Sequence, residues 1–169
     1  MCVRFRFKFI IHNLFFFLVD NAINHCISYV KKKEIRMKNK IFELYKPDSL
    51  AEFLDFHKNN PEEKFVYVAQ QPPANINILS ASDFGYLVIC LPNTGPESQA
   101  IYSTSPFVRK MKKNLQNIRP QDYLLAIGDP IIIGICNIAI SDITNGKFNV
   151  LKWDRREYRY YPLELDFYN

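Results

Sequence analysis

The sequence predicts a small α/β domain with a mixed sheet, a strand–helix–strand unit and a C-terminal antiparallel hairpin. Continuous apolar runs at residues 85–91 and 123–127 have the length of buried strands, and a helical pattern separates them. Such a strand–helix–strand unit predicts a right-handed parallel crossover. The stretches 147–154 and 158–165 flank a short polar turn and predict the hairpin at an edge of the sheet. A chain of 169 residues is long enough for one such domain.

The first predicted helix follows residues 47–49 (Pro-Asp-Ser), where apolar residues begin to recur at helical spacing. Ser49 and Glu52 have the spacing of a capping box, in which each side chain satisfies the other's free backbone N–H. Asn-Asn-Pro at 59–61 predicts the end of this helix. Residues 65–69 alternate aromatic and apolar side chains and predict a strand.

A second helix is predicted after a turn-rich connection and a short strand at residues 100–104. Ser105 predicts its N-cap, with Pro106 in the first helical position. The apolar spacing continues to Ile118, and Pro120 ends the helix. Its outer face is basic and consists of Arg109, Lys110, Lys112 and Lys113. Such a run is usually a solvated face.

The third predicted helix follows the strand at 123–127. Asp129 predicts its N-cap, and Pro130 occupies its first turn. Because residues 131–143 are apolar on nearly every side, this helix is expected to be buried, although its β-branched residues leave a strand as the alternative. Asn-Gly at 145–146 predicts a left-handed stop.

The net charge of +5 lies entirely at the start of the chain. Residues 1–36 carry seven basic and two acidic side chains, and residues 37–169 carry 15 of each. A nucleic-acid-binding domain would carry its charge within the folded body, which here is neutral. The apolar run in 1–36 is too short and interrupted for a secretory signal or a membrane span, although its basic, Phe-rich composition leaves a membrane or targeting role as an alternative.

We predict that residues 1–36 are a basic and aromatic extension outside the domain, and that 37–169 form a single α/β domain. Lys-Glu-Ile at 33–35 can be encoded by a purine-rich run that resembles a bacterial ribosome-binding site just before Met37. In this interpretation Met37 is the true start of the protein. The membrane alternative then disappears.

The turn at Gly128 and Asp129 is one candidate binding site. Ligands of open α/β sheets bind beyond the carboxyl ends of strands, where helix N-termini present free amides. Asp129 would then orient a ribose hydroxyl or a metal ion; the alternative is an ordinary N-cap. One glycine is far short of a dinucleotide fingerprint, and Pro130 removes an amide that a phosphate would use, so no cofactor is predicted.

The C-terminal hairpin is the second candidate binding site. Its candidate residues interleave cations with aromatic rings and are Trp153, Arg155, Arg156, Tyr158 and Arg159. Such a surface stacks bases and contacts phosphates, or anchors a protein partner. It also fits an edge hairpin held by aromatic cross-strand pairs and blunted by charge. The basic face of the second helix is the only other positive surface expected in residues 37–169.

No catalytic or metal-binding constellation is evident. Cys90 and Cys136 lie inside apolar runs and are expected in the core, and His57 is the single histidine of residues 37–169. The sequence therefore predicts no catalytic residue and no metal site, which favours a binding protein while leaving an enzyme open. Cysteines without a disulfide pattern fit a reducing compartment, and we expect the protein in the cytoplasm.

The order of three C-terminal motifs resembles that of small uncharacterised proteins carried by tailed phages. The motifs are IGDP at 127–130, LKWDR at 151–155 and YYP at 160–162. The resemblance implies a phage accessory protein in the host cytoplasm and supplies no activity. The sequence thus predicts a small soluble protein that binds another protein. Two alternatives remain: a weak single-stranded nucleic-acid binder using the hairpin, and a nucleotide-binding or hydrolytic protein using the turn at 128–130.

Overall fold

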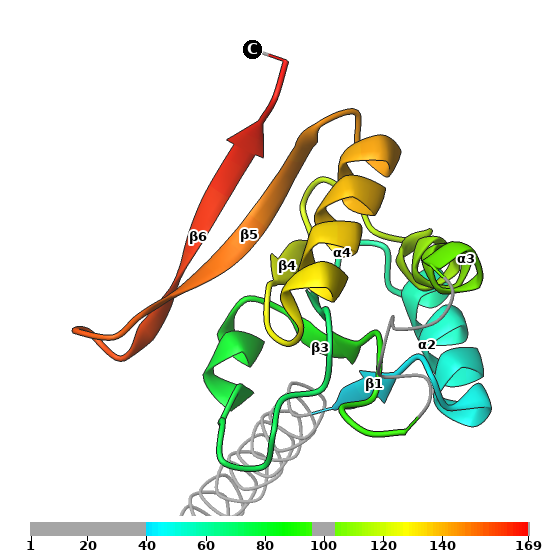
Figure 1. Ribbon diagram of the computed structural model, residues 1–169, viewed down its shortest axis with the longest axis horizontal. Helices are drawn as coiled ribbons and strands as arrows, with labels where there is room; N and C mark the ends of the chain where they lie inside the picture. The colour runs from blue at the N-terminus through cyan, green and yellow to red at the C-terminus, as the bar shows by residue number, and fades with distance from the viewer. Residues whose placement is uncertain (1–39, 96–103, 169) are drawn as a thin grey trace, which may run out of the picture. The chain divides into compact units, whose positions relative to one another are not determined.

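A computed structural model of the protein describes residues 40–95 and 104–168 (Figure 1). It confirms the predicted α/β class, with one six-stranded mixed sheet and a C-terminal hairpin. The elements in chain order are β1 (Ile41–Glu43), α2 (Pro47–Asn59), β2 (Phe65–Val68), the 3₁₀ helix η1 (Leu79–Asp83), β3 (Tyr86–Ile89), α3 (Thr104–Leu115), β4 (Tyr123–Leu125), α4 (Pro130–Ile143), β5 (Lys147–Asp154) and β6 (Arg159–Asp166). The predicted domain boundary at Met37 lies outside the described residues and stays a prediction.

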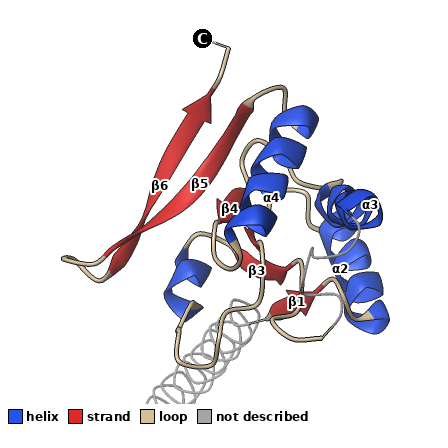
Figure 2. Ribbon diagram, in the orientation of Figure 1, coloured by secondary structure: helices blue, strands red, loops and turns tan. Residues whose placement is uncertain are grey.

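The strands lie in the order β1-β3-β2-β4-β5-β6, and every neighbouring pair is parallel except β5 with β6. Among the connections between parallel strands, those that advance toward β6 contain α2, α3 or α4, whereas the one that runs back, from β2 to β3, contains η1. Crossover connections between parallel strands are right-handed. Connections that run toward β6 and a connection that runs toward β1 therefore lie on opposite faces of the sheet. Figure 2 shows α2, α3 and α4 gathered on one side of the strands and the short helix η1 on the other.

The helix-covered face holds an aromatic core. Phe53 of α2 packs edge-on against Phe42 of β1 and Phe65 of β2, with ring centroids 5.5 Å apart in both pairs. Further fully buried side chains on the helices and strands complete this layer: Tyr67, Met111, Leu115, Leu124, Ile132, Ile140 and Phe148. Aromatic pairs of this geometry stabilise beyond the area that they bury.

The opposite face is covered more thinly. Ile78 and Ala81, at the start of η1, pack onto a cluster of strand residues that consists of Val66, Val68, Leu87, Ile89, Leu125, Leu151 and Tyr160. Because one short 3₁₀ helix and its preceding loop cannot cover the whole sheet, this face has room for a cavity beside them.

The signals around α4 are confirmed. The Asp129 carboxylate accepts a hydrogen bond from the backbone N–H of Ile131 at 2.7 Å, and Pro130 is the first residue of the helix. Asn145 and Gly146 adopt φ values of 52° and 76° directly after it. The segment is a helix rather than the alternative strand. The expectation that it is buried on nearly every side is wrong, since Ile131 is 61% and Ile138 66% exposed.

Other local expectations are corrected. The capping box is wrong, because α2 already begins at Pro47 and the Ser49 hydroxyl accepts from the backbone N–H of Glu43 at 2.8 Å. Helix α3 begins at Thr104, so Ser105 lies within its first turn instead of before it. The strand expected at 100–104 falls mostly on residues that the structure does not describe, since the description resumes at residue 104. In the part of the chain that the structure describes, no helix has the length and hydrophobicity to cross a membrane.

Candidate binding cavity at the carboxyl end of the sheet

Strands β2 and β4 are neighbours whose following connections leave to opposite faces of the sheet. Such a switch point is where open α/β sheets commonly bind ligands. Here the side chain of Gln70 ties the two strand ends together. Its Oε1 accepts from the N–H of Asp129 at 2.9 Å, and the backbone N–H of Gln70 donates to the carbonyl of Ile127 at 3.2 Å. The Gln70 side-chain amide also donates to the carbonyl of Pro92 at 3.2 Å, so this residue links the turn before α4 to the loop after β3.

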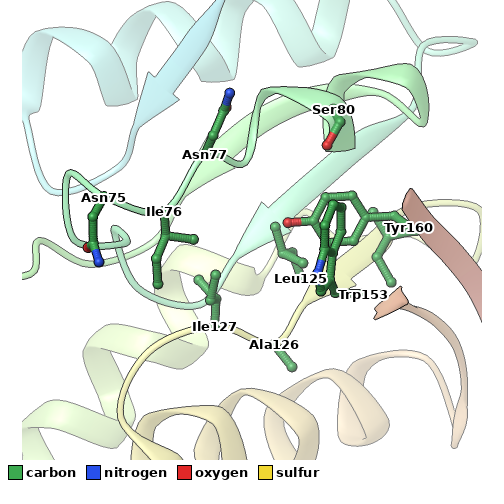
Figure 3. Close-up of a pocket in the computed structure, with 10 residues that line it drawn as sticks. Asn75, Ile76, Asn77, Ser80, Leu125, Ala126, Ile127, Trp153 and Tyr160 are labelled. Carbon is green, nitrogen blue, oxygen red and sulfur yellow. The ribbon is translucent and has the colours of Figure 1, made fainter. Parts of the chain in front are cut away.

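A cavity of about 550 Å³ lies on the η1 side of this switch point (Figure 3). Its wall combines the loop before η1, the end of β4 and the C-terminal hairpin. The lining residues are Asn75, Ile76, Asn77, Ser80, Leu125, Ala126, Ile127, Leu151, Trp153 and Tyr160. Segments far apart in the sequence thus meet around one space.

Two aromatic rings form one end of the cavity. Trp153 of β5 and Tyr160 of β6 are cross-strand partners, and their rings meet edge to face with centroids 4.9 Å apart. Figure 3 shows these rings facing Asn75 and Ile76 across the space. Tyr160 is 7% exposed, and its burial raises the pKa of the hydroxyl. Trp153 is 39% exposed, so its ring offers an accessible apolar surface.

The polar side-chain groups that line the cavity are two amides, two hydroxyls and the indole N–H of Trp153. Asn77 fixes the start of η1, because its Oδ1 accepts from the N–H of Leu79 at 2.8 Å. Among the described lining residues, none carries a charge. An apolar wall with a few amide and hydroxyl groups suits an uncharged ligand group that is flat or branched.

Of the predicted hairpin residues, only Trp153 lines this cavity. Arg155 and Arg156 lie in the turn between β5 and β6, where the Asp154 carboxylate accepts from the N–H of Arg156 at 2.7 Å. Tyr158 is 78% exposed in the same turn. Arg159 alternates with Tyr160 and therefore points to the other face of the hairpin.

On that other face Arg159 is already engaged. Its guanidinium lies 4.4 Å from the Tyr161 ring centroid and 2.5 Å from the Glu157 carboxylate. Arg159 and the exposed tryptophan therefore lie on opposite faces of the hairpin.

The predicted site residues Gly128 and Asp129 lie beside the cavity and serve the turn. Gly128 has φ +120°, and a Cβ there would lie 2.5 Å from the Cβ of Gln70, so only glycine fits. Asp129 caps α4 through its carboxylate and binds Gln70 through its N–H. The polar groups of this turn thus hold the switch point together.

A buried ion pair lies at the opposite, amino end of the strands. The Asp122 carboxylate, 1% exposed, accepts from the N–H of Phe65 at 3.0 Å and from the N–H of Arg119 at 2.9 Å. The Arg119 guanidinium binds the same carboxylate at 3.1 Å and donates to the carbonyls of Pro61 and Glu63. This cluster fixes the start of β2 to the approach of β4.

The remaining titratable core groups are poorly suited to catalysis. Burial raises the pKa of the Cys136 thiol to about 12 and that of Cys90 well above its usual value, so both stay protonated. Burial and the nearby Arg119 lower the pKa of His57, whose ring centroid lies 5.1 Å from that of Phe65. Within residues 40–95 and 104–168, no three His, Cys, Asp or Glu side chains gather to hold a metal ion.

The profile of the phage Pam3 gp32-like protein family matches residues 64–167. The chain belongs to this family. The matched segment runs from the start of β2 to the end of β6 and contains every residue that lines the cavity. The resemblance to phage proteins is confirmed. No curated protein and no solved structure matches the chain significantly.

Most of the cavity was invisible to sequence reasoning. The alternation Asn-Ile-Asn-Ile at 75–78 was the available signal that the loop before η1 packs one side on the core. The partnership of Trp153 and Tyr160 follows from the hairpin register once the length of the turn is known. The cavity forms because the connection from β2 to β3 crosses the face of the sheet opposite the three helices. No local sequence pattern shows which face a connection crosses.

Proposed function

We propose that this member of the phage Pam3 gp32-like family acts by binding another protein, with an apolar side chain of that partner entering the cavity. The observation that carries the proposal is the cavity wall, which pairs an accessible tryptophan with aliphatic side chains and uncharged polar groups. Interface anchors are typically aromatic or aliphatic side chains that fill such preformed pockets, and backbone amides beside them find hydrogen-bond partners. Asn75 and Ser80 offer such partners.

A nucleotide fits this end of the sheet less well. Pro130 has no N–H, the N–H of Ile131 is already bound by Asp129, and that carboxylate repels a phosphate. The cavity's described lining contributes no cation to compensate. These features favour an uncharged ligand group over a phosphorylated one.

A single-stranded nucleic acid also fits less well. Binding of this kind combines stacking rings with a continuous cationic groove. Arg159 is held by Glu157 on the face away from Trp153, and the basic face of α3 belongs to a different edge of the domain. On that face Lys112 is paired with Asp142 at 2.9 Å. The positive side chains are therefore dispersed.

The test is a calorimetric titration with short capped peptides. Acetyl-Gly-Phe-Gly-amide is expected to bind with a dissociation constant of about 1 mM, as suits a ligand of its size, and acetyl-Gly-Ala-Gly-amide to bind undetectably. Trp153→Ala should abolish the binding. The matched control Phe167→Ala removes an aromatic ring that is 63% exposed outside the cavity and should leave binding unchanged.

Parallel titrations distinguish the alternatives. Binding of AMP that exceeds binding of adenosine, without binding of the phenylalanine peptide, would favour a nucleotide site. Salt-sensitive binding of an oligothymidine that is lost in Arg155→Ala would favour a nucleic-acid binder. Either result overturns the proposal, and so does phenylalanine-peptide binding that survives Trp153→Ala.

A further inference from the structure

Helix α4 presents an apolar face that the rest of the described chain leaves uncovered. Ile131 is 61% exposed and Ile138 is 66% exposed. They are seven residues apart, so they lie on the same side of the helix, two turns from one another. Gly134 lies between them on this face, and a Cβ built there would meet nothing within 4 Å. Large exposed aliphatic side chains that share one face mark an interaction surface.

A hollow of about 430 Å³ adjoins this face at the C-terminal half of α4. It is lined by Asn137, Ile138, Ser141, Asp142, Phe167 and Tyr168. Phe167 and Tyr168, which are 63% and 77% exposed, form its wall after β6. One face of α4 therefore carries a protruding side chain, Ile131, near its start and a hollow near its end.

We propose that this face binds a second copy of the chain, with the two α4 helices packed antiparallel about a twofold axis. An interface of this kind requires each copy to supply both a projection and its complement. The axis passes between Gly134 and Ile135, so that Ile131 of each copy enters the hollow beside Ile138 of the other. The glycine at the axis lets the two helices approach closely.

The composition of the face suits burial against a copy of itself. Residues 130–141 contain no charged side chain, and Asp142 at the edge of the hollow is paired with Lys112 at 2.9 Å, so an antiparallel pair brings no unpaired like charges together along this stretch. The one amide in the hollow, that of Asn137, donates to the carbonyl of Ile133 at 2.8 Å and remains satisfied when it is covered. This pattern favours a second copy over a charged partner.

The dimer surface is separate from the cavity of the proposed function. Phe167 packs beside Phe148, which belongs to the helix-covered side of the sheet, whereas the cavity lies on the η1 side. Ligand binding by the cavity and pairing through α4 are therefore independent. Failure of one proposal leaves the other standing.

Sedimentation equilibrium of the full chain tests the pairing. The wild-type protein is expected to show a concentration-dependent dimer, and Ile138→Glu to sediment as a monomer at every concentration. Leu54→Glu is the matched control, because Leu54 is an apolar side chain on α2 that is 40% exposed and lies outside the face. It should leave the dimer intact.

Cysteine cross-linking tests the antiparallel arrangement. The double variant Ile131→Cys/Ile138→Cys should form a covalent dimer on mild oxidation, while each single variant should not, because like positions are then about 10 Å apart along the helices. The native Cys90 and Cys136 are buried, and Cys2 and Cys26 are replaced by serine in all of these variants so that only the introduced thiols can cross-link. A wild-type monomer throughout, or cross-linking by the single variants, would overturn the proposal.

Discussion

The two ends of the parallel strands differ in what their polar groups do. At the amino end, Asp122 and Arg119 satisfy each other and four backbone groups. At the carboxyl end, Gln70 ties β2 to β4, and beside it an uncharged cavity stays open next to Trp153. The difference separates a polar cluster that stabilises the fold from a surface that is available to a ligand.

The largest expected effect is at the amino end. Asp122→Ala removes the acceptor of two backbone N–H groups and leaves the guanidinium of Arg119 partly buried without its partner. We expect a loss of about 3–5 kcal/mol in the free energy of unfolding, measured by urea denaturation.

Asp55→Ala is the control for Asp122→Ala, because the Asp55 carboxylate binds only the exposed side chain of Asn59 among the described contacts. The free energy of unfolding of this variant should differ from that of the wild type by no more than about 0.5 kcal/mol. Equal losses in the two variants would show that the amino-end cluster is not a special source of stability.

A smaller loss is expected from Gly128→Ala at the carboxyl end. Its φ of +120° is unfavourable for alanine, and the new Cβ would lie 2.5 Å from Gln70 Cβ. We expect about 2 kcal/mol of destabilisation by urea denaturation, together with displacement of Gln70.

Gly95→Ala supplies the comparison, because Gly95 also has a positive φ, +89°, but a Cβ there meets nothing within 4 Å. Gly95→Ala should lower the free energy of unfolding by about 1 kcal/mol, because only the unfavourable backbone conformation contributes. If Gly128→Ala costs no more than this, Gln70 does not hold the switch point.

The smallest expected effect is a pH dependence from His57 at the amino end. Burial and Arg119 lower its pKa in the folded state, so the unfolded chain binds a proton more readily. The stabilisation is therefore complete above the usual histidine pKa of about 6.5 and is lost as the pH falls through the lowered value. Urea denaturation of wild type and His57→Gln at pH 7.5 and 5.5 checks this, and the wild type should lose more stability on acidification. Parallel losses would contradict it.

Local sequence signals predicted many of the helix and strand boundaries. The features that they missed depend on how the elements pack against one another. Asp129 and Pro130 marked the start of α4, and Asn145 and Gly146 its end, because caps and left-handed stops are encoded within a few residues. The three-residue strand β1 has too little sequence for a periodic pattern, and it was missed.

The side-chain environment was harder to predict than the elements. The all-round apolarity of α4 indicated burial, yet Ile138 stays exposed, because periodicity does not tell which neighbour covers a face. Ser49 had the spacing of a capping box but binds Glu43 of β1, a contact set by how the strand meets the helix. Of the cavity, only Trp153 was among the predicted site residues, since the cavity depends on the crossing of β2 to β3.

The central claim is that the carboxyl-end cavity receives an apolar side chain, and the emission of Trp153 tests it most directly. Trp153 is the only tryptophan of the chain and lines the cavity, so its fluorescence reports on that space alone. On addition of acetyl-Gly-Phe-Gly-amide we predict a blue shift and weaker quenching by acrylamide, with no change for acetyl-Gly-Ala-Gly-amide. Calorimetric binding without any change in Trp153 emission or quenching would place the ligand elsewhere and contradict the account.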